Sequence, residues 1–124
     1  MFAQLLGLKT ISPDALHQML EKEHPSVVDV NAPLSWSTNR VPGAINLDPL
    51  GYAEGDLPPD KDALLVFYCS NFMCRKAPNA ASRAKKMGYR NVRVMSAGIS
   101  GWLSAKLPTE SGASVPRSSP APRT

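Results

Sequence analysis

Both cysteines of the chain lie in one short segment that ends in two cations. Cys69 and Cys74 are five positions apart, and Arg75 and Lys76 follow directly. A cysteine attacks as its thiolate, and nearby cations or a helix N-terminus lower the pKa of the thiol. The same positive charge attracts anions. The segment therefore predicts a reactive thiolate at Cys69 beside an anionic substrate; the alternative is a buried, inert cysteine at the end of a strand.

The residues on either side of this segment predict the two elements that hold Cys69. Residues 63–68 form the most apolar run of the chain and predict a buried central strand. Small apolar residues recur at helical spacing after the loop and predict a helix that packs closely on the sheet, ended by Gly88. These residues are Ala77, Ala80, Ala81, Ala84 and Met87. Cys69 is thus expected between a strand end and a helix start.

The rest of the chain predicts alternating strands and helices. A helix starts at Ser12 as N-cap with Pro13 in its first turn, and Pro25 ends it. Further strands are expected at 9–11, 26–30 and 91–95 and after the Pro42-Gly43 turn. Residues 51–61 predict a surface loop, and residues 98–106 predict a last helix with Trp102 facing the core. This alternation predicts an α/β fold with a central parallel sheet flanked by helices, whose active site lies at the carboxyl ends of the strands.

Length and composition favour one domain. The 124 residues suffice for a single hydrophobic core, which we expect in residues 1–110, followed by a disordered Pro/Ser-rich tail at 111–124. The chain contains no apolar run near the roughly 20 residues that span a bilayer. Two cysteines are too few for a secreted disulfide framework. A cytoplasmic protein without membrane association is therefore expected.

Charge is distributed unevenly. Nine of the ten acidic residues lie between Asp14 and Asp62, whereas residues 63–109 hold no acid and eight Lys or Arg. One-signed charge suits a small anionic substrate or an acidic partner protein. Nucleic acid is not expected as a partner, because no aromatic residues interleave with the basic ones. Neither His17 nor His24 has a metal-ligand partner at usable spacing, so no metal and no cofactor are expected.

Four groups of residues follow one another along the chain in a specific order. They are Val27-Val28-Asp29-Val30 with Val41-Pro42-Gly43-Ala44-Ile45-Asn46, Tyr68-Cys69 with its basic loop, Gly88-Tyr89-Arg90-Asn91-Val92, and Gly98-Ile99-Ser100-Gly101-Trp102 with Leu107-Pro108. Together they resemble a single-domain rhodanese, the sulfurtransferase family. The resemblance covers roughly residues 8 to 110, and its strength lies in the order of the motifs. It implies a three-layer rhodanese-like fold and a monomer or weak dimer.

The resemblance also implies the chemistry. Cys69 would attack the outer sulfur of a donor such as thiosulfate and carry it as a persulfide to a thiol, a protein sulfur acceptor or cyanide. Arg75 is expected to bind the anion, with Lys76 and Arg40 as weaker candidates, and Asp29 is expected to be a structural hydrogen-bond acceptor. The other substrate-binding residues implied are Ser70, Asn71, Phe72, Met73 and Cys74.

The loop departs from the common rhodanese pattern. It has no glycine, Cys74 holds the fifth position after Cys69, and the arginine comes one place later. Cys74 is either a small apolar anchor or a resolving thiol that forms a disulfide with Cys69 or accepts its sulfur. Two further hypotheses stay open: a phosphatase or arsenate reductase of the same fold, favoured by the Cys69-x5-Arg75 spacing but lacking the usual histidine at Tyr68, and a binding module without turnover.

Overall fold

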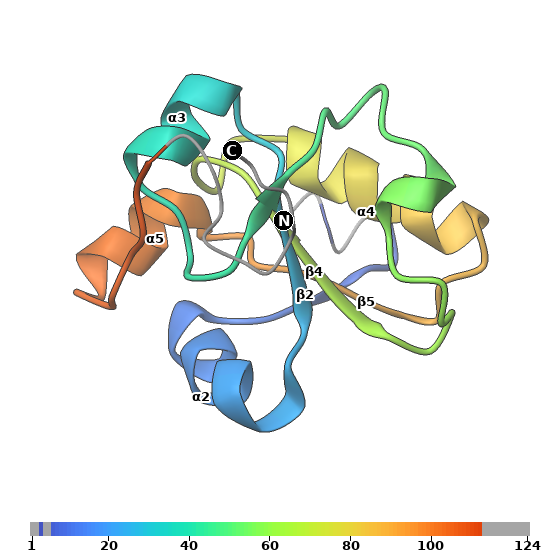
Figure 1. Ribbon diagram of the computed structural model, residues 1–124, viewed down its shortest axis with the longest axis horizontal. Coiled ribbons are helices and arrows are strands. Elements are labelled where there is room, and N and C mark those ends of the chain that lie inside the picture. The colour runs from blue at the N-terminus through green and yellow to red at the C-terminus, as the bar shows by residue number, and fades with distance from the viewer. Residues whose placement is uncertain (1–2, 4–5, 113–124) are drawn as a thin grey trace.

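A computed structural model describes residue 3 and residues 6–112, which form one five-stranded sheet with helices on both faces (Figure 1). All strand pairs are parallel, and the strand order is β1-β5-β4-β2-β3. The strands are β1 (Lys9–Thr10), β2 (Ser26–Asp29), β3 (Ile45–Asn46), β4 (Leu64–Tyr68) and β5 (Asn91–Val94). The predicted fold class is confirmed, with β4 at the centre of the sheet.

Within the described residues, helices α2 to α5 cover the sheet. They are α2 (Pro13–Glu23), α3 (Pro33–Thr38), α4 (Lys76–Lys86) and α5 (Gly98–Ser104), and a 3-10 turn spans Glu54–Asp56. Leu65 and Phe67 of β4 pack with the buried alanines of α4 on one face of the sheet. Val66 and Tyr68 point to the other face, where Leu16 of α2 and Trp102 of α5 complete a second cluster. In Figure 1, α4 and α2 lie on opposite sides of the strands.

The local signals that define these elements are visible in their contacts. The Ser12 hydroxyl accepts a hydrogen bond from the Ala15 N–H (3.1 Å), as the predicted N-cap requires. The four alanines of α4 that were expected to face the sheet are buried. Their small side chains let α4 lie close to β4 and β5, so that the start of α4 is held firmly above the carboxyl end of β4.

Two segments differ from the expectation. The loop at 51–61 is not wholly on the surface, because Tyr52 and Leu57 are buried against α4 and Tyr52 donates a hydrogen bond to the Ala80 carbonyl (2.6 Å). Residues 33–38, for which no helix was predicted, form α3. Its Trp36 is buried and donates its indole N–H to the Ala44 carbonyl (2.9 Å). Long-range contacts order both segments.

The last described residues are bonded to the rest of the domain through their backbone. Glu110 pairs with Arg40 through backbone hydrogen bonds in both directions (3.0 Å each), and the Gly112 N–H donates to the Ser37 carbonyl (2.8 Å). Residues 111 and 112, expected in the tail, are thus attached to the domain. The remainder of that tail, 113–124, lies outside the described residues. Among the described helices, none has the length and apolar character needed to cross a membrane.

Candidate active site

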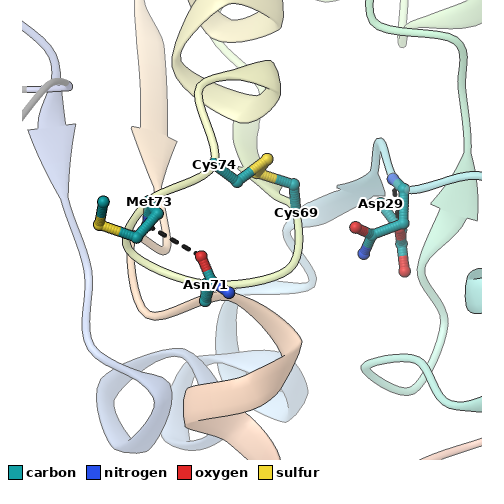
Figure 2. Close-up of a disulfide and its surroundings, with 6 residues drawn as sticks. Asp29, Cys69, Asn71, Met73 and Cys74 are labelled. Atoms are coloured by element: carbon teal, nitrogen blue, oxygen red, sulfur yellow. Dashed lines mark hydrogen bonds between the residues drawn. A yellow bond between two sulfur atoms is a disulfide. The ribbon is translucent and has the colours of Figure 1, made fainter.

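Cys69 follows β4 directly and is bonded to Cys74 by a disulfide (Figure 2). The two Cα atoms are 6.4 Å apart, and the bridge closes the loop between the end of β4 and the start of α4. Two roles were left open for Cys74, and the disulfide shows that its thiol can bond to Cys69. Cys69 is 3% exposed, whereas Cys74 is half-buried.

The loop returns to Cys69 through a tight turn at Asn71. The Asn71 side-chain carbonyl accepts a hydrogen bond from the Met73 N–H (2.9 Å), and its backbone carbonyl accepts one from the Cys74 N–H (3.1 Å). A short polar side chain that bonds to the backbone two residues ahead is a common turn-forming device. Figure 2 shows the Asn71–Met73 bond on the side of the loop opposite the bridge. Asn71 thus shapes the loop that brings the two sulfur atoms together.

The start of α5 holds the other side of the loop. Ile99 and Ser100 donate their N–H groups to the carbonyls of Cys69 and Ser70 (2.9 Å each). The Cys69–Ser70 and Ser70–Asn71 peptide bonds are trans, so the N–H of each bond points in the direction opposite to its carbonyl oxygen. The N–H groups of Ser70 and Asn71 are therefore directed away from α5. Donors fixed in this way are the kind that stabilise a developing or bound anion.

Gly98 allows α5 to approach so closely. Its φ is +66°, and a Cβ built there would lie 2.5 Å from the Ser70 carbonyl carbon and 2.7 Å from the Asn71 nitrogen. Only a residue without a side chain fits between α5 and the loop backbone. Sequence reasoning named Gly98 only as part of a family motif, and the need for close approach gives it a physical role.

Two cavities border the loop, and Cys74 lines both of them whereas Cys69 lines only one. A groove of about 480 Å³ runs along the outside of the loop and includes Cys74 but not Cys69. Its lining residues are Pro49, Leu50, Ser70, Asn71, Met73, Cys74, Arg75, Lys76 and Asn79. A much smaller hollow of about 10 Å³ borders both cysteines from the inside, together with Phe72 and Ser96. The groove therefore gathers most of the predicted substrate-binding residues, whereas Phe72 belongs to the hollow.

Ser96 is a residue that sequence reasoning missed. It lies just beyond β5, whose Val94 pairs with Phe67 of β4, so the register continued by two residues places Ser96 beside Cys69. Its hydroxyl oxygen is buried and has no hydrogen-bond partner among the described residues. The rule that sites form at the carboxyl ends of parallel strands would have identified it.

Positive charge surrounds the outer side of the loop. Arg75 is the N-cap residue of α4 and Lys76 its first residue, and both side chains are exposed and line the groove. The helix start adds partial positive charge from its first N–H groups. Together these features fit the anion expected at the loop. Within the described part of the chain, no group of three or more His, Cys, Asp or Glu residues could hold a metal ion.

Asp29 lies across the sheet from the sulfur. It pairs with Tyr68 in the register of β2 and β4, and its carboxylate accepts hydrogen bonds from the Tyr68 hydroxyl (2.6 Å) and the Asn31 N–H (2.8 Å). Consecutive side chains of a strand point to opposite faces, so this network lies on the face away from Cys69. Figure 2 shows Asp29 on its own strand, apart from the disulfide. Asp29 therefore supports the fold.

Burial dominates the electrostatics of this pair. It raises the pKa of Asp29, and the hydrogen bonds from Tyr68 and Asn31 offset part of the rise. Burial, together with the neighbouring carboxylate, also raises the pKa of Tyr68. The Tyr68 oxygen in turn accepts the Val41 N–H (3.0 Å), which ties the turn before β3 to the centre of the sheet. Neither group is placed to exchange a proton with Cys69.

The structure corrects the expectation that Arg40 binds the substrate. Its side chain is fully buried, lies over the Trp36 ring (4.1 Å from the ring centre) and pairs with Glu110 (3.6 Å). It also donates to the carbonyls of Trp36 (3.2 Å) and Gly112 (2.8 Å). Arg40 lines neither cavity of the loop and instead fastens the carboxyl-terminal segment. A lone arginine near a Pro-Gly turn gave no signal of this distant partner.

Comparison with known proteins agrees with this architecture. Rv0324 of Mycobacterium tuberculosis, an HTH-type transcriptional regulator, is 34% identical over 92 residues; these cover 73% of this chain but only 39% of the regulator. The thiosulfate sulfurtransferase GlpE of Actinobacillus succinogenes is 28% identical over 110 residues, covering 89% of this chain and 97% of GlpE.

The fold itself is similar to solved structures. The crystal structure of SseA from Escherichia coli, described with the "Rhodanese" fold of 3-mercaptopyruvate sulfotransferases, superposes with a TM-score of 0.73 at 17% identity, over 87% of this chain and 52% of SseA. The family model of the rhodanese-like domain matches residues 12–105, which include every strand except β1, the whole loop and α5. The chain therefore belongs to the rhodanese-like domain family.

Proposed function

We propose that the chain is a sulfurtransferase that carries sulfane sulfur as a persulfide on Cys69. The observation that carries the proposal is the position of Cys69, which ends the central strand and opens a loop held by α4 and α5. Similarity to GlpE over nearly its full length supports thiosulfate as a donor. The cations at the start of α4 suit an anionic donor of this kind.

The transfer takes two displacements at sulfur. The Cys69 thiolate attacks the outer sulfur of thiosulfate, the S–S bond of the donor breaks, and its electron pair leaves with sulfite. An acceptor thiolate or cyanide then attacks the outer sulfur of the persulfide, and the electron pair returns to Cys69. Sulfite carries negative charge, which Arg75 and the loop N–H groups are suited to stabilise. Because Cys69 is bonded to Cys74, the disulfide must be reduced before the first step.

The experiment starts from fully reduced protein from which the reductant has been removed. Intact mass is recorded within the first seconds after thiosulfate is mixed with the protein, and thiocyanate formation is measured with cyanide present. We expect a transient species heavier by one sulfur atom and, with cyanide present, the formation of thiocyanate. Cys69→Ser should form neither. An unmodified wild-type mass together with an absence of thiocyanate would overturn the proposal.

The spacing Cys69-x5-Arg75 supports a second candidate, a phosphatase or arsenate reductase of the same fold. Its cysteine and arginine border adjacent cavities at the start of α4. Hydrolysis of an aryl phosphate and reduction of arsenate, measured on the same reduced protein, separate the candidates. Activity on either oxyanion without thiocyanate formation would favour the second one. If Cys69→Ser retains every measured effect, a binding module is favoured instead. Similarity to a transcriptional regulator supports testing that role.

A further inference from the structure

Cys74 is bonded to the sulfur atom that the proposed reaction would load. The Asn71 turn brings Cys74 to Cys69 while β4 and α4 retain their hydrogen bonds, so the two sulfur atoms meet within the folded domain. A persulfide on Cys69 would therefore form next to a second thiol of the same loop. A thiol held at bonding distance competes strongly with any acceptor that must diffuse in from solution.

We infer that Cys74 resolves the Cys69 persulfide and releases its outer sulfur as hydrosulfide. This inference rests on the proposed function, because it needs the persulfide. The Cys74 thiolate attacks the Sγ of Cys69, a new S–S bond forms between the two cysteines, and the bond from Cys69 to the outer sulfur breaks. The electron pair leaves with the outer sulfur, which takes the proton given up by the Cys74 thiol and departs as HS⁻. The sulfane sulfur is reduced and the two cysteine sulfurs are oxidised, so electrons balance within the loop.

The bond already present in the structure favours attack on the inner sulfur. The atom that Cys74 reaches is Cys69 Sγ itself, and attack there expels hydrosulfide, a leaving group of low basicity. Attack on the outer sulfur would only move the persulfide from one cysteine to the other. The disulfide is the product of the first route and not of the second.

The inner hollow offers a place for the departing sulfur. It borders both cysteines and holds about 10 Å³, room for roughly one water-sized group. The buried Ser96 hydroxyl at its wall has no partner among the described residues and can donate a hydrogen bond to the outer sulfur. A donor at this position would stabilise negative charge as it develops on hydrosulfide.

The outer groove offers access for the reductant that completes the cycle. Cys69 is 3% exposed, whereas Cys74 is half-buried and lines the groove of about 480 Å³ together with Arg75 and Lys76. An incoming thiolate therefore meets the Cys74 sulfur first. Attack there forms a mixed disulfide on Cys74 and frees the Cys69 thiolate for the next donor. A second thiol of the same reductant then releases Cys74.

The complete cycle converts thiosulfate and a dithiol into sulfite, hydrogen sulfide and the oxidised dithiol. Two electrons and two protons pass from the dithiol to the sulfane sulfur, and the chain returns to its reduced state. The reaction class is that of a thiosulfate reductase driven by a dithiol, with the loop disulfide as an obligatory intermediate. A rhodanese without the second cysteine needs an external acceptor for this step.

A single-turnover experiment tests the inference on the intact chain. Reduced wild-type protein, freed of reductant, receives equimolar thiosulfate without cyanide or thiol, and sulfide, free thiols and intact mass are followed over time. We expect one equivalent of sulfide, loss of both thiols, and a final mass lower than the reduced protein by two hydrogen atoms. Cys74→Ser, the matched control, should instead accumulate the species with one added sulfur and release no sulfide.

The outcomes separate this inference from the proposed function. If wild type and Cys74→Ser both hold the added sulfur and release no sulfide, the inference is overturned while the sulfurtransferase proposal stands. If neither protein gains sulfur or releases sulfide, both fail. A sulfur found on Cys74 by peptide mapping would also overturn the inference that Cys74 attacks the inner sulfur. Finally, oxidised wild type treated with a chromogenic monothiol should carry the adduct on Cys74; an adduct on Cys69 would contradict the proposed route of reduction.

Discussion

Replacing Gly98 with alanine isolates the contribution of the close approach between α5 and the loop. Gly43 supplies a matched control, because its φ is +82° and a Cβ there would meet no atom within 4 Å. An alanine at either position adopts a left-handed backbone, which costs about 1–2 kcal/mol. At Gly98 the new Cβ would in addition lie 2.5 and 2.6 Å from the Ser70 carbonyl carbon and oxygen, which belong to backbone and cannot rotate away.

Relief of that overlap requires α5 and the loop to separate. The hydrogen bonds from Ile99 to Cys69 and from Ser100 to Ser70 would lengthen, with a cost of about 0.5–1.5 kcal/mol each. We therefore expect Gly43→Ala to lower the free energy of unfolding by about 1–2 kcal/mol and Gly98→Ala to lower it by about 2–5 kcal/mol. The Ser70 and Asn71 N–H groups would also lose their orientation, so Gly98→Ala should load sulfur more slowly.

Urea unfolding in reducing buffer measures the stability difference, and rapid-mixing mass analysis with thiosulfate measures the loading rate. Reducing conditions remove the disulfide from the comparison. Equal losses of stability in the two variants would refute the reasoning, because only the overlap with Ser70 distinguishes them. If Gly98→Ala were loaded with sulfur at the wild-type rate, the view that α5 orients the loop N–H groups would separately be refuted.

Three further predictions concern residues away from the sulfur. Tyr68→Phe leaves the Val41 N–H and one Asp29 oxygen without their buried partner. The free energy of unfolding measured in urea should therefore fall by about 2–4 kcal/mol. An unchanged value would show that the network relaxes freely. Burial raises the pKa of Asp29 above its ordinary value of 3.8, so the folded state holds the proton more tightly and the stability contributed by Asp29 falls as the pH rises through the raised pKa. Urea titrations of wild type and Asp29→Asn at several pH values should therefore show wild type losing stability relative to the variant as the pH rises from about 4; a constant difference would contradict this sign. Arg40→Met removes the hydrogen bond to Gly112 and the pairing with Glu110. It should lower the free energy of unfolding in urea by about 2–4 kcal/mol, while the KM for thiosulfate stays at the wild-type value. A raised KM would show that Arg40 contributes to substrate binding.

Local patterns sufficed for the elements next to Cys69. The apolar run before it and the alanine spacing after it predicted β4 and α4 within a residue or two at most boundaries, because burial on one or both faces imposes a strict periodicity. The place of Cys69 at the carboxyl end of the central strand followed from the same signals. These parts of the site depend on residues that are close in sequence.

Features that depend on distant partners could not be predicted. Arg40 is buried because Glu110 and Gly112 return to it from 70 and more positions away. Tyr52 is buried because α4 passes over a segment whose Gly, Pro and Asp content suggested only a surface loop. The choice between an apolar and a bonded Cys74 depends on how the Asn71 turn directs the chain. Composition and spacing carry no information about such contacts.

Tyr68 and Cys69 are neighbours in the chain, yet the alternation of β4 sends their side chains into different layers of the molecule. Tyr68 belongs to the layer formed by α2 and α5, whereas Cys69 belongs to the layer formed by α4. Changes to the loop can thus accumulate without disturbing the buried tyrosine–aspartate pair that fastens the opposite layer. The sheet thus separates the Cys69 side chain from the tyrosine–aspartate pair, while the backbone of the loop stays bonded to α5 of the opposite layer. Side chains of the cysteine loop can therefore be replaced at little cost to the buried pair, provided that the backbone contacts with α5 are kept.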